Sequence, residues 1–178
     1  MRLLCLVPVA ALAACGGGQS ENKAKSGAQT LAAGQYEITS EVTQFRQADA
    51  GAPKINTPAG TRTTRSLCLS EGGQAPPDLF ADEGLTCQSA GSFYARNGVL
   101  NLQIRCTRPD LQGNVSYTVN GSFDGQSFQA DRQLSTSLSG DGDVVIASRI
   151  QGRRTGECTP GAAPVVNGPA AKAGGKGK

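Results

Sequence analysis

Apolar residues recur at every second position along most of the chain between residues 34 and 158, whereas no long stretch has helical spacing. The clearest runs are Tyr36, Ile38 and Val42, then Leu100, Leu102, Ile104 and Cys106, and then Val115, Tyr117 and Val119. Successive side chains of a strand point to opposite faces of a sheet, so this period predicts strands with one buried face. We therefore expect an all-β domain, a single antiparallel meander of about seven strands that forms a curled sheet or partial barrel.

Turn sequences predict how these strands pair. Asn97-Gly98 and Asp124-Gly125 are typical of two-residue type I′ turns, and Asn120-Gly121 is a competing turn. With a two-residue turn at Asp124-Gly125, a single register pairs all residues on one face of the two strands that flank the turn. That register places Val115 opposite Leu134, Val119 opposite Ala130 and Gly121 opposite Phe128. The loop 139–143 would then place Val144 opposite Leu138 and Ser148 opposite Leu134.

The remaining segments are placed by their glycine and proline content. A loop rich in both at 48–60 separates the first strand from a second strand around 62–69. Pro76 and Pro77 followed by Asp78 predict one short helical turn that extends to Phe80. The strand 144–154 closes the domain.

The start of the chain has the layout of a bacterial lipoprotein leader. Residues 1–14 carry Arg2 and an apolar run too short to span a bilayer, which predicts a signal peptide. Leu12-Ala13-Ala14-Cys15 resembles a lipobox, in which the cysteine is lipidated before cleavage. Gly16 after it resembles the pattern of lipoproteins sent to the outer membrane, so we expect a lipid anchor there, facing the periplasm. An ordinary signal peptide with an incidental cysteine is the alternative.

Composition indicates the bounds of the folded domain and the kinds of partner that it can bind. Residues 15–33 and 159–178 are rich in Gly, Ala, Ser and Lys, which predicts a flexible tether and a disordered tail around one β domain at 34–158. That domain holds eleven Arg and Lys against thirteen Asp and Glu, so a basic nucleic-acid surface is not supported. Three lysines at 172–178 could touch anionic lipid or cell-wall polymer, but a solvated tail is the simpler interpretation.

Four cysteines remain once Cys5 is assigned to the leader and Cys15 to lipid. In an exported chain they predict two disulfides, and their spacing does not suit a metal site. Cys87 and Cys106 both share a face with apolar neighbours, so we expect them to pair, with a bulge near Gly91 to correct their register. Cys68 and Cys158 then pair by elimination.

Two segments and the cysteine order resemble a known family. The segments are Ala-Gly-Gln-Tyr-Glu-Ile-Thr at 33–39 and Gly-Arg-Arg-Thr-Gly-Glu-Cys at 152–158. Together with the four cysteines they resemble the proteobacterial domain of unknown function 3617 family over residues 34–158. Its members look like small exported proteins or lipoproteins. The resemblance implies no activity and no catalytic residue.

Three groups of charged residues are candidate sites. Arg153 and Arg154 could clamp an anion, but we expect one on each face of the last strand, with one paired to Glu37 or Glu157. The aspartates of Gly-Asp-Gly-Asp at 140–143 could touch calcium, although a plain turn explains them better. Asp78, Asp82 and Glu83 are interpreted as an acidic helix start.

The sequence favours binding over catalysis. It contains no histidine, which excludes a Ser-His site, and the domain has one lysine, Lys54, in a loop. We expect no enzyme activity, no cofactor and no metal. The first hypothesis is a non-catalytic envelope lipoprotein, held at the membrane by lipid on Cys15, with a structural or interaction role. The second is a periplasmic module that binds a small apolar or lipid-like ligand, because the domain has few large aromatic residues to fill a curled sheet.

Overall fold

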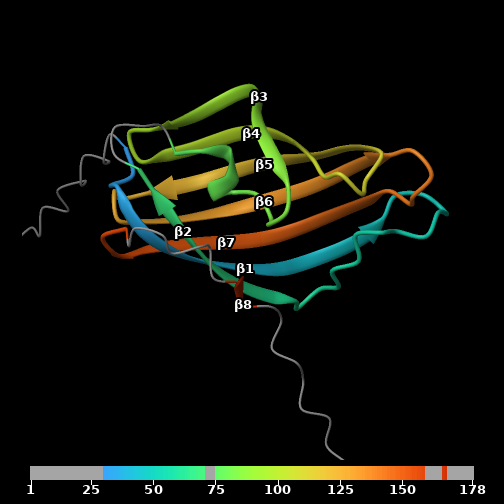
Figure 1. Ribbon diagram of the computed structural model, residues 1–178, viewed down its shortest axis with the longest axis horizontal. Helices are drawn as coiled ribbons and strands as arrows, with labels where there is room; N and C mark the ends of the chain where they lie inside the picture. Colours follow the sequence, from blue (N-terminus) through green and yellow to red (C-terminus); the bar gives the residue numbers. More distant parts are fainter. Residues whose placement is uncertain (1–29, 71–74, 159–165, 168–178) are drawn as a thin grey trace, which may run out of the picture.

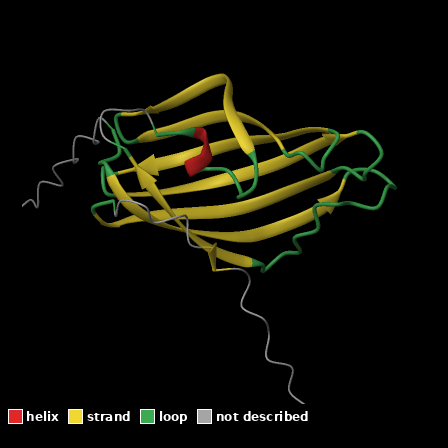
Figure 2. Ribbon diagram, in the orientation of Figure 1, coloured by secondary structure: helices red, strands yellow, loops and turns green. Residues whose placement is uncertain are grey.

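A computed structural model describes residues 30–70, 75–158 and 166–167 (Figure 1). This part of the chain is all-β with one 3-10 turn, as the alternating pattern predicts (Figure 2). The elements in chain order are β1 (Gly34–Gln47), β2 (Arg62–Leu69), η1 (Pro77–Leu79), β3 (Thr86–Arg96), β4 (Val99–Thr107), β5 (Gly113–Phe123), β6 (Ser127–Leu138), β7 (Val144–Gly156) and β8 (Val166–Asn167).

All strands belong to one antiparallel sheet in the order β3-β4-β5-β6-β7-β1-β2-β8. Strands β3 to β7 form a simple meander, and β1 then pairs with β7, so that the first hairpin extends the sheet beyond its last long strand. The sheet is not closed, because β3 and β8 remain at its two edges. The two residues of β8 pair with Thr64 and Arg65 and lie in the segment that the sequence predicts to be a disordered tail.

The sheet is curled around the segment of residues 75–85 (Figure 1), and core side chains lie on the concave face that this segment covers. Burial alternates along the strands, with every second residue of β4 buried and the others exposed. A segment of residues 75–85, here called the plug, lies over this face and contributes buried side chains to the core. They are Ala75, Leu79, Phe80 and Ala81. The convex face meets solvent, so half of each strand is polar.

The predicted hairpin turn at Asn97-Gly98 is confirmed, but the turn predicted at Asp124-Gly125 has a different length. Asn97 and Gly98 both have positive φ, and Arg96 pairs with Val99 across a two-residue turn. At Asp124 the last paired residues of β5 and β6 are Phe123 and Phe128, so that four residues lie between them instead of two. The Asp124 carboxylate accepts hydrogen bonds from the backbone of Gln126 and Ser127 at 3.1 and 2.8 Å, which stabilises the wider loop.

The predicted register from this loop onward is therefore wrong by two residues. Gly121 lies opposite Ala130, Val119 opposite Arg132, and Val115 opposite Thr136, while Asn120-Gly121 lies within β5 rather than in a turn. The β6–β7 register also moves by two, so that Ser148 lies opposite Arg132 and Leu134 opposite Ile146. A shift of two keeps every side chain on its predicted face. The buried faces of these strands were thus predicted correctly, although their pairing partners were not.

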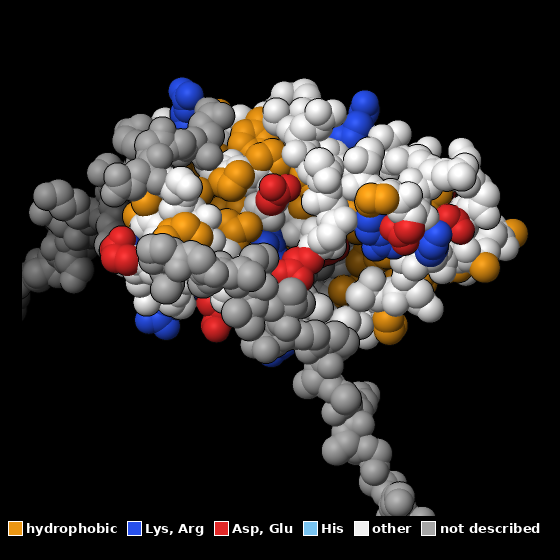
Figure 3. Space-filling model, viewed as in Figure 1, with side chains coloured by type: hydrophobic (Ala, Val, Ile, Leu, Met, Phe, Trp, Pro, Cys, Tyr) orange, Lys and Arg blue, Asp and Glu red, His pale blue; other side chains and the backbone are white. Residues whose placement is uncertain are grey.

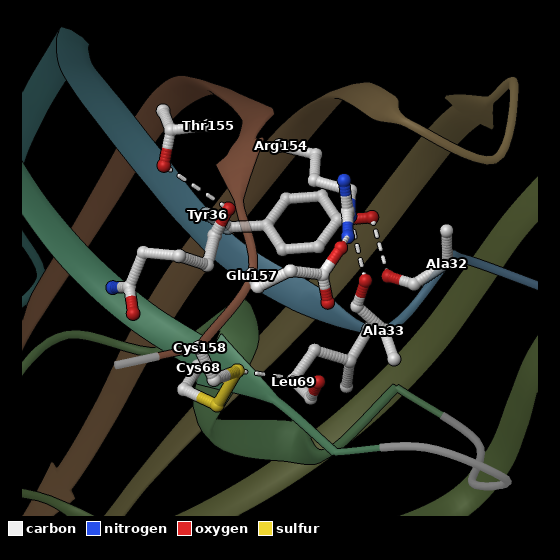
Figure 4. The surroundings of a disulfide bond; sticks show 10 residues. Ala32, Ala33, Tyr36, Cys68, Leu69, Arg154, Thr155, Glu157 and Cys158 are labelled. Carbon is white, nitrogen blue, oxygen red and sulfur yellow. Dashed lines mark hydrogen bonds and ion pairs between the residues drawn. A yellow bond between two sulfur atoms is a disulfide. The ribbon is translucent and has the colours of Figure 1, made fainter. Parts of the chain in front are cut away.

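Both predicted disulfides are present. Cys87 and Cys106 are opposite each other with Cα atoms 4.1 Å apart, and the register shift between Ser89 and Phe93 is the bulge expected at Gly91. The second bridge joins Cys68 in β2 to Cys158 just after β7, with Cα atoms 5.5 Å apart (Figure 4). This bridge connects two segments 90 residues apart in the chain.

The ordered domain begins slightly earlier than the boundary at Gly34. Leu31 is buried in the core, and the amide of Ala32 donates to the carbonyl of Gly125 at 2.6 Å. The predicted leader, Cys15, most of the tether, and the tail except for β8 lie outside the described residues. Among the described residues, no helix is long and apolar enough to cross a membrane.

Candidate functional site

A cavity of about 310 Å³ opens on the concave face, between the sheet and the plug. Its floor is apolar and comes from three strands: Ile38 and Val42 of β1, Leu134 of β6, and Ile146 and Ile150 of β7. Figure 3 shows this face of the molecule, with hydrophobic side chains among acidic and basic ones. The volume is at the lower end of the range of small-molecule sites, about 300–1,000 Å³.

Two segments form the walls of the cavity. The plug contributes Leu79, Phe80 and Leu85, and the loop 48–61, here called the strap, contributes Ile55 and Thr57. The strap reaches the loop between β4 and β5, where Lys54 Nζ donates to the carbonyl of Asp110 at 2.5 Å. It also rests on the β6–β7 turn, where the Gly142 amide donates to the carbonyl of Ala52 at 2.9 Å. These contacts hold the proline-rich loop over one end of the cavity.

Arg132 on β6 connects the sheet to the plug. Its side chain is buried, yet every nitrogen of its guanidinium has a partner. Nε donates to Ser148 Oγ at 3.0 Å, Nη2 to Ser40 Oγ at 3.1 Å, and Nη1 to the carbonyl of Phe80 at 3.1 Å. Nη1 also lies 2.8 Å from Asp82 Oδ1. One side chain therefore links β6, β7, β1 and the plug.

Tyr117 completes this polar cluster. The Arg132 guanidinium lies 5.2 Å from the centre of the Tyr117 ring, and the Tyr117 hydroxyl donates to Asp82 Oδ2 at 3.1 Å. Burial of the phenol, followed by the nearby Asp82 charge, raises the pKa of Tyr117 far above its usual value. Tyr117 therefore stays protonated and acts as a hydrogen-bond donor that orients Asp82.

Arg65 and Glu83 lie at the plug side of the cavity. Arg65 Nη2 donates to the carbonyls of Asp78, Leu79 and Ala81 at 2.8, 2.8 and 2.9 Å, which fastens the plug to β2. Burial lowers the pKa of Arg65, partly offset by Asp82. Glu83 also lines the cavity, and its Oε1 is buried without a hydrogen-bond partner among the described residues.

The acidic group was partly misinterpreted from the sequence. Asp78 does lie in the first turn of η1. Asp82 and Glu83 lie beyond η1, and Asp82 is the partner of Arg132 rather than part of a helix start. The chain offered a signal for Arg132 itself, because it shares the parity of Phe128, Ala130 and Leu134 on the buried face of β6. A charge in phase with apolar residues is informative, since buried charges need partners.

The two arginines near the end of β7 have structural roles. Arg153 is exposed, whereas Arg154 is half-buried and bonds to Glu157, one of the two predicted carboxylates (Figure 4). Arg154 Nε also donates to the carbonyl of Ala33 at 2.6 Å, which fixes the entry into β1. Tyr36 lies beside it, and its hydroxyl donates to the carbonyl of Ala32 at 2.9 Å. This cluster joins the two segments that carried the family resemblance.

The Gly-Asp-Gly-Asp segment forms a turn that is hydrogen-bonded to β6 and to the strap. Asp143 Oδ1 accepts from Thr136 Oγ1 and from the amide of Leu138, both at 2.9 Å. Its amide donates to Asp49 Oδ2 at 3.1 Å, so the turn also holds the start of the strap. In the described part of the chain, no group of three or more metal-binding side chains comes together.

Comparison with known proteins identifies a family. Residues 31–158 match the family model described as "Protein of unknown function (DUF3617)", which covers more than half of the chain. No curated protein and no solved structure matches this sequence. The match begins at Leu31 and ends at Cys158, so it includes the whole cavity and both disulfides.

Proposed function

We propose that this chain, which belongs to the family described as "Protein of unknown function (DUF3617)", is a non-catalytic binding protein that holds a small apolar ligand in its cavity. The supporting observation is the apolar floor under the plug and strap. Of the two hypotheses drawn from the sequence, a structural role and a binding role, this floor favours the second.

The driving force for ligand binding would be the hydrophobic effect. A ligand seated on Ile38, Ile146 and Ile150 would remove apolar surface from water, at about 25 cal/mol per Å². Polar groups elsewhere on the wall would fix its orientation, as in other small-molecule sites. The strap can adjust to a ligand, because its ion pair with Asp110 is exposed at 4.0 Å and therefore weak.

The side chains around the cavity suit binding better than bond-making. Asp82 and Arg132 are bound to one another, and the Tyr117 hydroxyl donates to Asp82. The whole chain lacks histidine, the usual proton carrier near neutral pH. These features support a role in carrying or sensing a ligand.

The location is part of the same proposal. The lipobox-like Leu12-Ala13-Ala14-Cys15 and the Gly- and Ser-rich segment after it support a lipid anchor on Cys15 at the periplasmic face of the outer membrane. The core begins at Leu31, which leaves residues 16–30 to span between anchor and domain. A binding domain on such a tether could sample ligands near the membrane surface.

A tryptophan placed in the strap should block the cavity. Thr57 is half-buried and lines the cavity, whereas its neighbour Asn56 is exposed. We expect Thr57→Trp to lower affinity for the uncharged probe N-phenyl-1-naphthylamine at least tenfold, because the indole occupies the space that the probe needs. Asn56→Trp is the matched control and should bind like the wild type. The measurement is a fluorescence titration of the probe.

The natural chain has no tryptophan, so each introduced indole also reports its own surroundings. Its emission should be blue-shifted at position 57 and solvent-like at position 56. Equal probe binding by the two variants, or no binding by the wild type, would contradict the proposal.

Replacing the proposed anchor should release the protein from membranes. Cys15→Ala removes the sulfur that would carry the lipid, and we expect the variant to lose incorporation of labelled acyl chains. Two or more acyl chains are needed for durable attachment, so loss of all of them should move most of the protein to the soluble fraction. Membrane fractionation and acyl labelling measure both effects. A Cys15→Ala protein that remains labelled and membrane-bound would rule out this anchor.

A further inference from the structure

Resting on the proposed function, we infer that the cavity selects an uncharged ligand with an apolar body and a hydrogen-bond donor, such as a hydroxyl group, that reaches Glu83 Oε1. The first observation is the state of that oxygen. It is buried, it belongs to a residue that lines the cavity, and it has no partner among the described residues. A buried acceptor without a donor is costly, so a ligand that supplies the donor gains affinity.

The nearby arginines and the tyrosine donate to other groups. Arg65 Nη2 donates to the carbonyls of Asp78, Leu79 and Ala81. Arg132 gives its nitrogens to Ser148, Ser40, Phe80 and Asp82. The Tyr117 hydroxyl hydrogen is used by Asp82. Among the described residues of the cavity, Glu83 Oε1 is thus an acceptor to which a ligand can donate a hydrogen bond.

The balance of charge points to an uncharged ligand. Three arginines and two carboxylates line the cavity, and two of these arginines have acidic partners, Arg132 with Asp82 and Arg108 with Asp110. Asp110 is also 4.0 Å from Lys54, but Lys54 is exposed and lies outside the cavity lining. The remaining pair, Arg65 and Glu83, is neutral in sum. A ligand anion or cation would therefore add an uncompensated charge to a partly desolvated site, which is unfavourable. A hydroxyl group adds a donor without adding charge.

The size of the cavity indicates the size of the ligand. A volume of about 310 Å³ is at the lower end of the range of small-molecule sites, about 300–1,000 Å³, so the ligand is small. A medium-chain alcohol has this size and this chemistry. Its chain would lie on the floor formed by Ile38, Val42 and Ile150, with its hydroxyl toward Glu83.

The test is displacement of N-phenyl-1-naphthylamine from the full-length protein by four compounds of similar length. These are 1-octanol, 1-methoxyheptane, octanoate and octylammonium at neutral pH. 1-Methoxyheptane has the same atoms as 1-octanol but no donor. We expect 1-octanol to compete at least tenfold better than each of the others, the change typical of a hydrogen bond to a charged acceptor.

Variants at position 83 test whether Glu83 is the acceptor. Glu83→Leu should bring 1-octanol down to the affinity of 1-methoxyheptane, whereas Glu83→Gln keeps an acceptor oxygen and should keep the preference. Glu37→Leu, at an exposed position of β1, is the control and should behave like the wild type. Probe binding by each variant shows that the cavity is intact.

The outcomes separate this inference from the proposed function. If the probe binds but 1-octanol and 1-methoxyheptane compete equally in the wild type, the inference that the ligand donates to Glu83 is wrong. The proposal that the cavity binds apolar ligands is then still supported. Preference for octanoate or octylammonium would overturn the uncharged class. If neither probe nor alkyl compound binds, both proposals fall.

Discussion

Arg132→Leu is expected to lower the free energy of unfolding by about 3–5 kcal/mol, the range seen when one member of a buried charged network is removed. The buried carbonyl of Phe80 and the hydroxyls of Ser40 and Ser148 would lose their donor. Unsatisfied buried groups cost about 1–3 kcal/mol each. Asp82 contributes less, because its side chain is 47% exposed and can be hydrated.

The effect should extend beyond stability. Arg132 is one of two arginines that fasten the plug, and the plug forms a wall of the cavity. Arg132→Leu should therefore also weaken binding of N-phenyl-1-naphthylamine. Arg132→Lys keeps the charge but not the planar fork of donors, so it should recover only part of the stability. Urea unfolding followed by circular dichroism measures the first effect, and probe titration the second.

Arg149 provides a matched control for Arg132. It lies on the neighbouring strand β7, faces solvent, and has a 3.7 Å ion pair with Asp131 between two exposed side chains. Exposed pairs contribute little, so Arg149→Leu should change stability by no more than about 0.5 kcal/mol. If Arg132→Leu is as stable as Arg149→Leu, Arg132 does not hold the plug in the way described.

Removing the disulfide Cys68–Cys158 is expected to cost about 4–5 kcal/mol, and removing Cys87–Cys106 about 3 kcal/mol. The difference follows from the loops that they close, 90 and 19 residues. A longer closed loop restricts the unfolded chain more, so its loss releases more entropy. Double Cys→Ala variants of each pair, compared by urea unfolding, measure both values.

The long-range bridge should also affect the cavity. β2 carries Thr63 and Arg65 of the cavity wall, and Cys68 joins the end of this strand to Cys158. Loss of this bridge should therefore weaken probe binding at temperatures where the domain is still folded. The Cys87–Cys106 bridge joins β3 to β4, two strands that contribute no residue to the cavity lining, and serves as the control. The opposite order of stabilities would contradict the loop-entropy explanation.

Local signals predicted the faces of the strands better than their partners. Parity along β5 and β6 identified the buried side chains, because the alternation of a strand depends only on the chain itself. The pairing depended on the loop at Asp124, whose carboxylate bonds two backbone amides and favours four residues over two. The sequence Asp-Gly is compatible with both loops, so the choice could not be read from it.

The candidate site was less predictable than the fold. The general idea of an apolar space in a curled sheet came from composition, but its walls are formed by the plug and the strap, which have no periodic pattern. Asp82 and Arg132 are 50 positions apart and meet because the plug folds back over β6. Arg132 was visible in the sequence only as a charge in phase with apolar residues.

The sequence by itself determined the strands β1 to β7, their buried faces and the family, because each depends on local alternation or on a short motif. It also predicted the two disulfides, although Cys68 and Cys158 were paired only by elimination. The tertiary structure alone decided the register of β5 to β7, the place of β1 beside β7, and the cavity between sheet and plug. These features arise from contacts between distant segments. Their energies depend on geometry that no single stretch of sequence contains.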